Sequence, residues 1–171
     1  MNFKNIHKSL RKQKGFTLIE ILIVIGIIAI LAVIVVVAIN PAKQFAQARN
    51  TQRTANVNTI LNAIGQRVAD NKGIFAGTFT IGATTYTCGP LTTSQTEINT
   101  TMASDTTTAT SDLGCLVPTY VSSLPTDPAG VTAPGIGYEV SVNTSGRITV
   151  CAPDAALETA LPSPASICVT R

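Results

Sequence analysis

The sequence predicts an α+β fold in which a long N-terminal helix packs against a small antiparallel β-sheet domain. Three observations predict this fold. Residues 21–39 form an uncharged apolar run of nineteen residues, a helical periodicity follows, and the rest of the chain consists of short β-prone pieces separated by turn residues. We therefore expect four parts: a leader at 1–15, a membrane-spanning half-helix at 16–40, an amphipathic half-helix at 41–72 and a β-rich domain at 73–171.

The first fifteen residues have the composition of a targeting segment, with five of the twelve basic residues of the chain and no acidic residue. A secretory signal usually carries its cleavage site after the apolar stretch, but here the candidate site, Gly15, precedes it. Cleavage after Gly15 would leave the apolar run in a mature chain that begins at Phe16. The basic leader favours a cytoplasmic start and an exported C-terminal domain, although Lys43, Arg49 and Arg53 beyond the run weaken that bias.

The apolar run at 21–39 is long enough to cross a bilayer as a helix. Glu20 lies directly before this run. Because an acidic side chain at the centre of a bilayer costs about 2.5 to 3.5 kcal/mol, we expect Glu20 to have a partner. Pro41 follows the run and disfavours helical geometry at Asn40, which predicts a kink or local unwinding there.

An apolar stripe marks the second half of the helix. Its members recur at spacings of three and four residues, as one buried helical face requires, and they are Val57, Ile60, Leu61, Ile64 and Val68. We expect Arg49 and Arg53 to lie on the other, solvated face of this helix. The alternative is that the two arginines contact acidic residues of neighbouring subunits in an assembly. Asn71, Lys72 and Gly73 predict the end of the helix, because glycine tolerates the left-handed conformation that caps it.

Beyond the helix, residues 74–88 are rich in threonine, isoleucine and aromatic side chains. Residues 137–153 have the pattern of two alternating strands, and the turn residues at 143–146 make them the strongest hairpin prediction in the chain. Residues 91–112 contain nine threonines and little that could be buried. There we expect an exposed loop or a short, poorly packed helix.

All four cysteines lie beyond the apolar run, and none belongs to a C-x-x-C pair. An even number of cysteines in an exported domain indicates disulfides rather than zinc or thioredoxin-like chemistry. Three pairings are available, and proximity alone favours Cys88 with Cys115 and Cys151 with Cys168. Four reduced, buried thiols are the alternative.

An enzyme is not expected. The single histidine, His7, lies in the leader, so the mature chain has none for a Ser-His pair, a Cys-His pair or a zinc site. Asp127 with Glu139, and Asp154 with Glu158, have the spacing of ordinary surface acids. Acidic residues outnumber basic ones beyond residue 70, a balance that does not indicate a nucleic-acid surface.

The residues KGFTLIE at 14–20, with the aliphatic run behind them, closely resemble the N-terminus of type IV pilins and pseudopilins. A basic leader, a glycine, a phenylalanine and a glutamate fifth after the cut rarely coincide by chance. The resemblance implies that a membrane prepilin peptidase cuts after Gly15 and methylates the new amine of Phe16. It also implies that Glu20 is the carboxylate typical of this family, and that a helical proline usually lies a few residues earlier than Pro41.

This resemblance places the partner of Glu20 in another molecule. Methylation preserves the positive charge of the Phe16 amine, and a pair between that amine and Glu20 of a neighbouring subunit would offset much of the desolvation of both charges. Glu20 would then fix the register of an assembly. Snorkelling of Glu20 at the membrane interface is the alternative.

The implied function is that of a structural subunit of a type IV pilus-like filament serving adhesion, motility or DNA uptake. The alternative is a pseudopilin of a type II secretion or competence machine. The implied partners are further copies of the chain in a helical filament, the inner membrane, the prepilin peptidase, and an assembly platform with its ATPase. We expect a single-pass inner-membrane protein before assembly and an extracellular or cell-surface filament afterwards.

Residues 123–130, SLPTDPAG, are similar to the proline-and-aspartate loop of major pseudopilins, which binds calcium in some members. The similarity ends after Gly130. We expect Asp127 to be an ordinary turn residue, with a calcium ion held by Asp127 and backbone carbonyls as the alternative. No other cofactor is expected.

Overall fold

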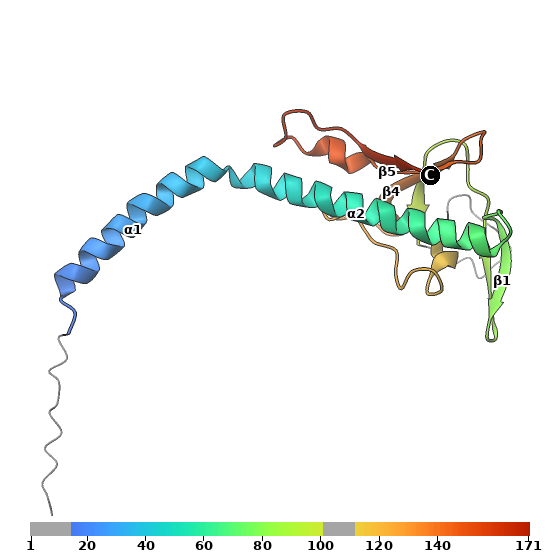
Figure 1. Ribbon diagram of the computed structural model, residues 1–171, viewed down its shortest axis with the longest axis horizontal. Coiled ribbons are helices and arrows are strands. Elements are labelled where there is room, and N and C mark those ends of the chain that lie inside the picture. The colour runs from blue at the N-terminus through green and yellow to red at the C-terminus, as the bar shows by residue number, and fades with distance from the viewer. Residues whose placement is uncertain (1–14, 101–111) are drawn as a thin grey trace, which may run out of the picture. The chain divides into compact units, whose positions relative to one another are not determined.

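The computed structural model describes residues 15–100 and 112–171 (Figure 1). The leader up to residue 14 and the centre of the threonine-rich segment, 101–111, lie outside the described residues. The chain divides into two compact units, 1–41 and 42–171. The first contains helix α1, and the second contains helix α2 with both β-sheets, which makes the fold α+β as predicted.

Helix α1 spans Leu18–Ile39, twenty-two residues. At about 1.5 Å per residue it is roughly 33 Å long, enough to cross a hydrocarbon layer of about 30 Å. Asn40 follows with a left-handed backbone at φ 47°, and α2 (Pro41–Asp70) begins at the next residue. The predicted kink is therefore a one-residue interruption of the helix, because the proline ring excludes Asn40 from helical geometry while suiting the first position of α2.

The stop predicted after α2 has the expected geometry. Lys72 and Gly73 both have positive φ angles, of 55° and 92°. The Gly73 amide donates a 2.8 Å hydrogen bond to the Val68 carbonyl, which satisfies one of the free carbonyl groups at the helix end.

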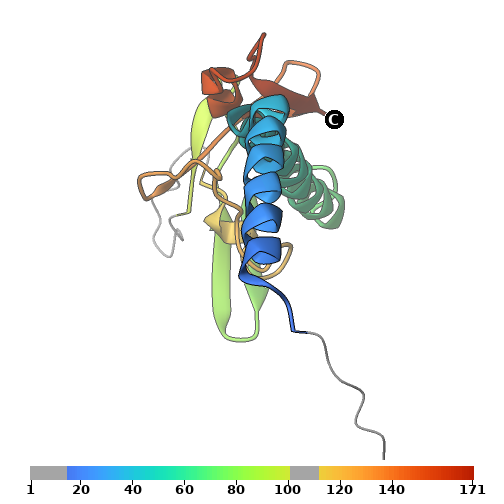
Figure 2. The ribbon, with the colours of Figure 1, turned by 90° about the vertical axis from the view of Figure 1, so that its left-hand side faces the viewer.

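The second unit holds two antiparallel sheets. Strands β1 (Gly77–Ile81) and β2 (Thr84–Cys88) form a separate hairpin. It lies by the C-terminal end of α2 in Figure 1 and is the light-green hairpin that points downward in Figure 2. The four-stranded sheet has the order β3-β4-β5-β6. Its strands span Thr96–Asn99, Gly135–Val142, Ile148–Ala152 and Ile167–Thr170.

Two short 3₁₀ helices, η1 (Gly114–Leu116) and η2 (Pro153–Leu157), complete the second unit. The hairpin predicted around residues 143–146 is confirmed as the β4–β5 pair, in which Val142 lies opposite Ile148. The loop or helix predicted for 91–112 is wrong at Thr96–Asn99, which pairs with β4 as an edge strand. Ile98 explains the difference, because burying this one apolar side chain against the core offsets the weak local preference of the segment.

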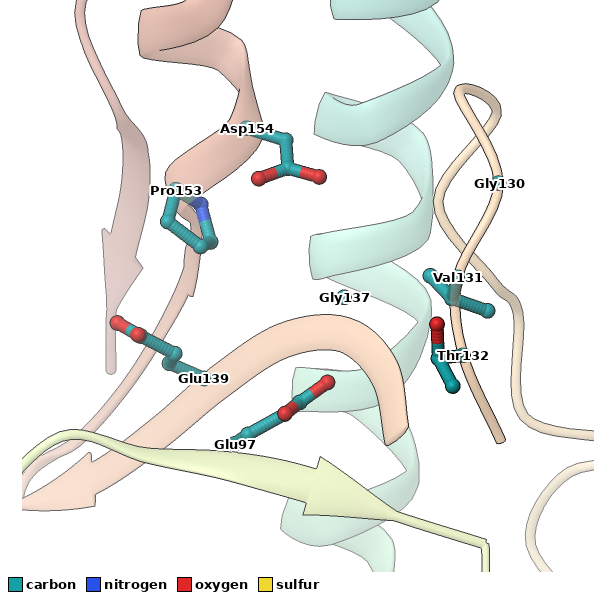
Figure 3. A pocket seen from close by; sticks show the side chains of 8 residues that line it. All are labelled: Glu97, Gly130, Val131, Thr132, Gly137, Glu139, Pro153 and Asp154. Carbon is teal, nitrogen blue, oxygen red and sulfur yellow. The ribbon is translucent and has the colours of Figure 1, made fainter. Parts of the chain in front are cut away.

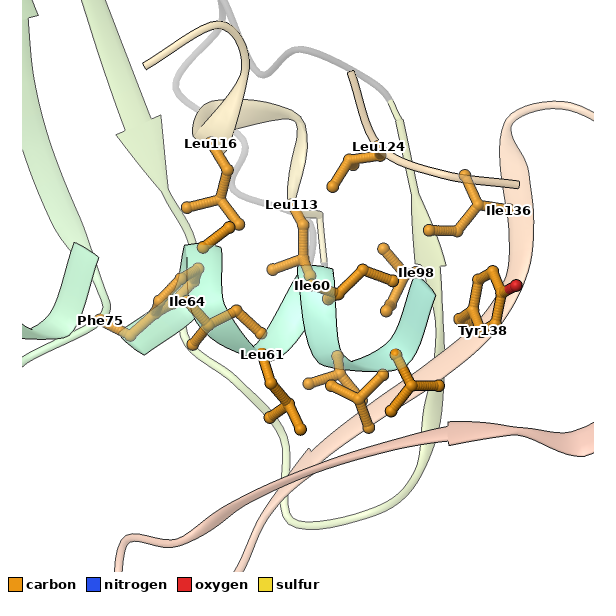
Figure 4. Close-up of a cluster of buried hydrophobic side chains, with 14 of the residues drawn as sticks. Ile60, Leu61, Ile64, Phe75, Ile98, Leu113, Leu116, Leu124, Ile136 and Tyr138 are labelled. Carbon is orange, nitrogen blue, oxygen red and sulfur yellow. The ribbon is translucent and has the colours of Figure 1, made fainter. Parts of the chain in front are cut away.

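The core lies between α2 and the four-stranded sheet (Figure 4). The stripe predicted on α2 is buried here, with Val57, Ile60 and Ile64 fully inaccessible and Val68 partly buried. Side chains of β3, β4, β5 and η1 pack against it, and they include Ile98, Leu116, Ile136, Tyr138, Val140 and Val150.

Both disulfides join segments of the second unit. Cys88 at the end of β2 is bonded to Cys115 in η1, and Cys151 in β5 is bonded to Cys168 directly opposite it in β6. These are the nearest-neighbour pairs that proximity favoured. Bridges that close loops of 27 and 17 residues would each contribute about 3 kcal/mol in the chain-entropy model.

Candidate functional site

The start of α1 brings Thr17 and Glu20 together. The Thr17 hydroxyl accepts a hydrogen bond from the Glu20 amide at 3.2 Å, while Glu20 Oε2 accepts from the Thr17 amide at 3.0 Å and from its hydroxyl at 2.9 Å. This reciprocal arrangement is a capping box. It holds the carboxylate at the positive end of the helix dipole and against fixed donors, which partly offsets the cost of carrying a charge at the edge of an apolar segment.

The hydrogen bonds from Thr17 to the Glu20 carboxylate both go to Oε2. No hydrogen bond to Oε1 occurs within the described part of the chain. Phe16, whose amine would become the chain terminus after cleavage at Gly15, is 85% exposed. The carboxylate is thus positioned by its own chain at the start of α1.

The side chains that follow on α1 are apolar and uncovered. No residue of α1 is buried, and α1 is the only helix in the described ranges that is long and apolar enough to cross a membrane. A helix that is hydrophobic on every side requires either lipid or other helices around it.

Residues 10–36 match the family model of the prokaryotic N-terminal methylation motif. The chain carries the class III prepilin leader of type IV pilins. The match covers Gly15, Phe16 and Glu20 together with most of α1. No curated protein and no solved structure matches the chain.

The leader indicates a type IV pilin-like or pseudopilin protein, a structural subunit rather than an enzyme. It implies processing by a prepilin peptidase and assembly into a filament. Together with α1 it fits anchoring in a membrane before assembly.

The second unit also contains a group of charges that we call the α2 ion cluster: the buried Arg53, Asp127 and Glu158, and Arg49, whose side chain is 38% exposed. The Arg53 guanidinium donates two hydrogen bonds to the Asp127 carboxylate, from Nε to Oδ2 at 2.6 Å and from Nη2 to Oδ1 at 2.8 Å. Its Nη1 donates to Glu158 Oε1 at 2.6 Å and to Asn50. Arg49 then donates to both oxygens of Glu158.

Charge pairing shifts the pKa values within the α2 ion cluster. Hydrogen bonds from Arg49 and Arg53 outweigh burial and lower the pKa of Glu158 from 4.5 to about 2. The bond to Asp127 raises the pKa of Arg53 further above its ordinary value, against the opposing effect of burial. The cluster pairs two arginines with two carboxylates, so its formal charges balance.

The solvated face predicted for Arg53 is wrong, because its side chain is only 1% exposed. The prediction of surface acids also fails for Asp127 and Glu158, which are both buried. One sequence signal could have located Arg53: it precedes Val57 by four residues and so lies on the buried stripe of α2. Its acidic partners follow more than 70 positions later, and no local pattern connects them.

The loop that carries Asp127 also holds its carboxylate in place for the contact with Arg53. Asp127 Oδ1 also accepts a hydrogen bond from the Ala129 amide at 2.8 Å, so it is a turn residue as expected. Calcium binding at Asp127 stays a prediction, and an ion there would compete with Arg53 for both carboxylate oxygens. The described residues contain no group of three His, Cys, Asp or Glu side chains that could hold a metal ion.

An open pocket of about 720 Å³ lies beside this loop (Figure 3). Three carboxylates line it, and they come from three elements: Glu97 from β3, Glu139 from β4 and Asp154 from η2. No ion pair between these carboxylates and a basic group occurs within the described ranges. The predicted pairs therefore separate, since Asp127 and Glu158 belong to the ion cluster while Glu139 and Asp154 line the pocket.

Proposed function

We propose that this pilin-like protein is the structural subunit of a type IV pilus-like filament. In this proposal prepilin peptidase cleaves after Gly15 and methylates Phe16, and an assembly platform with its ATPase extracts the subunit from the inner membrane. The exposed α1 helices then bundle together at the centre of an extracellular or cell-surface filament that serves adhesion, motility or DNA uptake.

One observation carries the proposal: a prepilin leader is joined to a fully exposed apolar helix that begins with a capped carboxylate. A plain membrane anchor would need neither Glu20 nor a cleavage site before the apolar run. Bundling removes the α1 side chains from water or lipid contact, and the Phe16 amine of a neighbouring copy supplies a counter-charge for Glu20. Pairing at this single position fixes how far one helix slides along the next.

The test compares Glu20→Ala with Glu20→Asp and the unaltered chain in a strain that assembles filaments from it. We expect Glu20→Ala to reach the membrane and be cleaved at Gly15, yet to give no sheared filaments. Glu20→Asp retains the charge and should give an intermediate yield. Intact mass should show the loss of fifteen residues and the gain of one methyl group. An uncut terminus, or normal filaments from Glu20→Ala, would refute the proposal.

A pseudopilin of a type II secretion or competence machine is the second candidate, and the loop at 123–130 favours it. Electron microscopy separates the two functions. Long fibres on cells at the ordinary expression level support a pilus. Absence of fibres, together with loss of protein export or transformation on deletion of the gene, supports a pseudopilin.

A further inference from the structure

A groove that the proposed function does not use lies beside the C-terminal half of α2. It consists of two cavities, of about 510 Å³ and about 300 Å³, which adjoin because Val68, Gly146 and Ile148 line both of them. All of the lining residues belong to the second unit. Cavities of this size are typical of ligand-binding clefts. We call the two joined cavities the α2 groove.

The lining of the α2 groove is largely apolar and is fixed by the core. Leu61 and Phe75 belong to the core cluster, and Val68 and Ile148 are packed against it. Ile74, which also lines the groove, is 61% exposed. Covering these side chains would remove apolar surface from water, and a surface held by the core loses little conformational entropy on binding.

A glycine inside α2 keeps the groove open. Gly65 lines the groove at a position where glycine is less favourable than any residue except proline. Beyond its own turn of the helix, a Cβ added at Gly65 would meet no atom of the described chain within 4 Å. Packing within the described chain therefore does not require this glycine, whereas a ligand that approaches the helix backbone closely would require it.

The charge beside the groove is positive, and no carboxylate is paired with it. Arg171 lines the groove, and its guanidinium donates hydrogen bonds to the side-chain oxygens of Asn58 and Asn62. These neutral amides orient the guanidinium without cancelling its charge. Among the described residues, no acidic side chain lines either cavity, and neither Arg171 nor Arg147 forms an ion pair. Charge complementarity therefore favours an acidic ligand.

We propose that the α2 groove binds a peptide segment of a partner protein that carries apolar side chains and an acidic residue. The apolar side chains would pack on Leu61, Val68 and Ile148 beside the backbone of Gly65. The acidic residue would pair with Arg171, which its two amide partners already hold in position. This inference goes beyond filament assembly, because it requires no contact between copies and applies equally to a pilus subunit and to a pseudopilin.

The test selects peptides from a random library displayed on phage against the full chain in phosphatidylcholine nanodiscs. Phages that bind empty nanodiscs are removed first, so that lipid binders are not counted. We expect the enriched peptides to combine aliphatic or aromatic residues with aspartate or glutamate. No enrichment over empty nanodiscs, or enrichment of basic peptides, would overturn the proposal.

Two groove variants and one matched control locate the binding. Gly65→Leu fills the groove with a better helix former, so its unfolding midpoint should not fall and a loss of binding would not reflect unfolding. A synthetic enriched peptide should bind Gly65→Leu and Arg171→Gln about tenfold or more weakly than the unaltered chain. Ala55→Leu adds the same side chain at an exposed position of α2 outside the groove and should bind normally. Unchanged affinity in either groove variant would overturn the proposal.

Discussion

Gly137 and Gly146 have the same backbone conformation in different surroundings. Both have φ near +76°, a left-handed backbone angle that residues other than glycine rarely adopt. A Cβ on Gly137 would lie 2.8 Å from Asp127 Cβ and 2.8 Å from Val131 Cγ1, whereas a Cβ on Gly146 would meet nothing within 4 Å. Gly137 is thus required both for its own conformation and for the approach of the loop that carries Asp127.

We therefore predict that Gly137→Ala destabilises the protein more than Gly146→Ala. Gly146→Ala should cost only the left-handed strain, about 1 to 2 kcal/mol. Gly137→Ala should cost at least about 1 kcal/mol more, because the added carbon displaces the Asp127 loop from β4. Chemical denaturation of the detergent-solubilised chain measures both losses. Equal losses in the free energy of unfolding would show that the Asp127 loop can move away from the added carbon without any loss of stability.

At the scale of elements, the α2 ion cluster attaches two later segments to α2. Asp127 belongs to the loop before β4, and Glu158 follows η2. From Val57 onward the buried side chains of α2 are apolar except for Arg67, but before Val57 they are Ala46 and Arg53. The first half of α2 therefore depends on charge pairing where the second half depends on hydrophobic burial.

This attachment predicts a specific response to acid. The pKa of Glu158 is about 2 in the folded chain, below its ordinary value of 4.5, because two arginines stabilise the carboxylate. Its contribution to stability is present above about pH 4.5 and is lost as the pH falls towards 2. Glu158→Gln should be less stable than the unaltered chain at neutral pH and should lose less stability across this acid window.

The control for the acid response is Glu139→Gln, since Glu139 has no ion pair within the described ranges. It should follow the unaltered chain at each pH. Thermal unfolding between pH 2 and pH 7, followed by circular dichroism, gives the comparison. Parallel curves for Glu158→Gln and the unaltered chain would contradict the role assigned to Glu158.

On the scale of the whole molecule, the buried core and the exposed apolar helix belong to different units. The buried residues of the described chain run from Ala46 to Glu158, and none belongs to α1. The unit at 42–171 also contains both disulfides. Its stability should therefore not depend on α1.

We predict that a fragment of residues 42–171, exported to an oxidising compartment, folds without detergent and remains monomeric. Its unfolding midpoint should match that of the second unit in the detergent-solubilised full chain, because removal of α1 takes away no buried side chain. Light scattering and differential scanning calorimetry measure both properties. A fragment that is unfolded or aggregated would show that α1 supports the core.

Prediction from the sequence succeeded where one periodicity or one local motif decided the structure. The stripe from Val57 to Val68, the interruption before Pro41 and the β4–β5 hairpin each depend on residues close together in the chain. Prediction failed for Arg53, Asp127 and Glu158, whose burial depends on partners far away in sequence. It also missed β3, where a single buried isoleucine decides the conformation of a threonine-rich segment.

The sequence by itself determined the prepilin leader, the membrane-length helix and the position of Glu20, because these features are continuous in the chain and their chemistry does not depend on folding. Only the tertiary structure decided which charges are buried together and which apolar side chains remain outside. The reason is physical: a buried ion pair forms only when the fold brings complementary groups into contact and excludes water. The spacing of apolar residues identified the face of α2 that is buried. Only the folded chain showed that Arg53 is buried on that face.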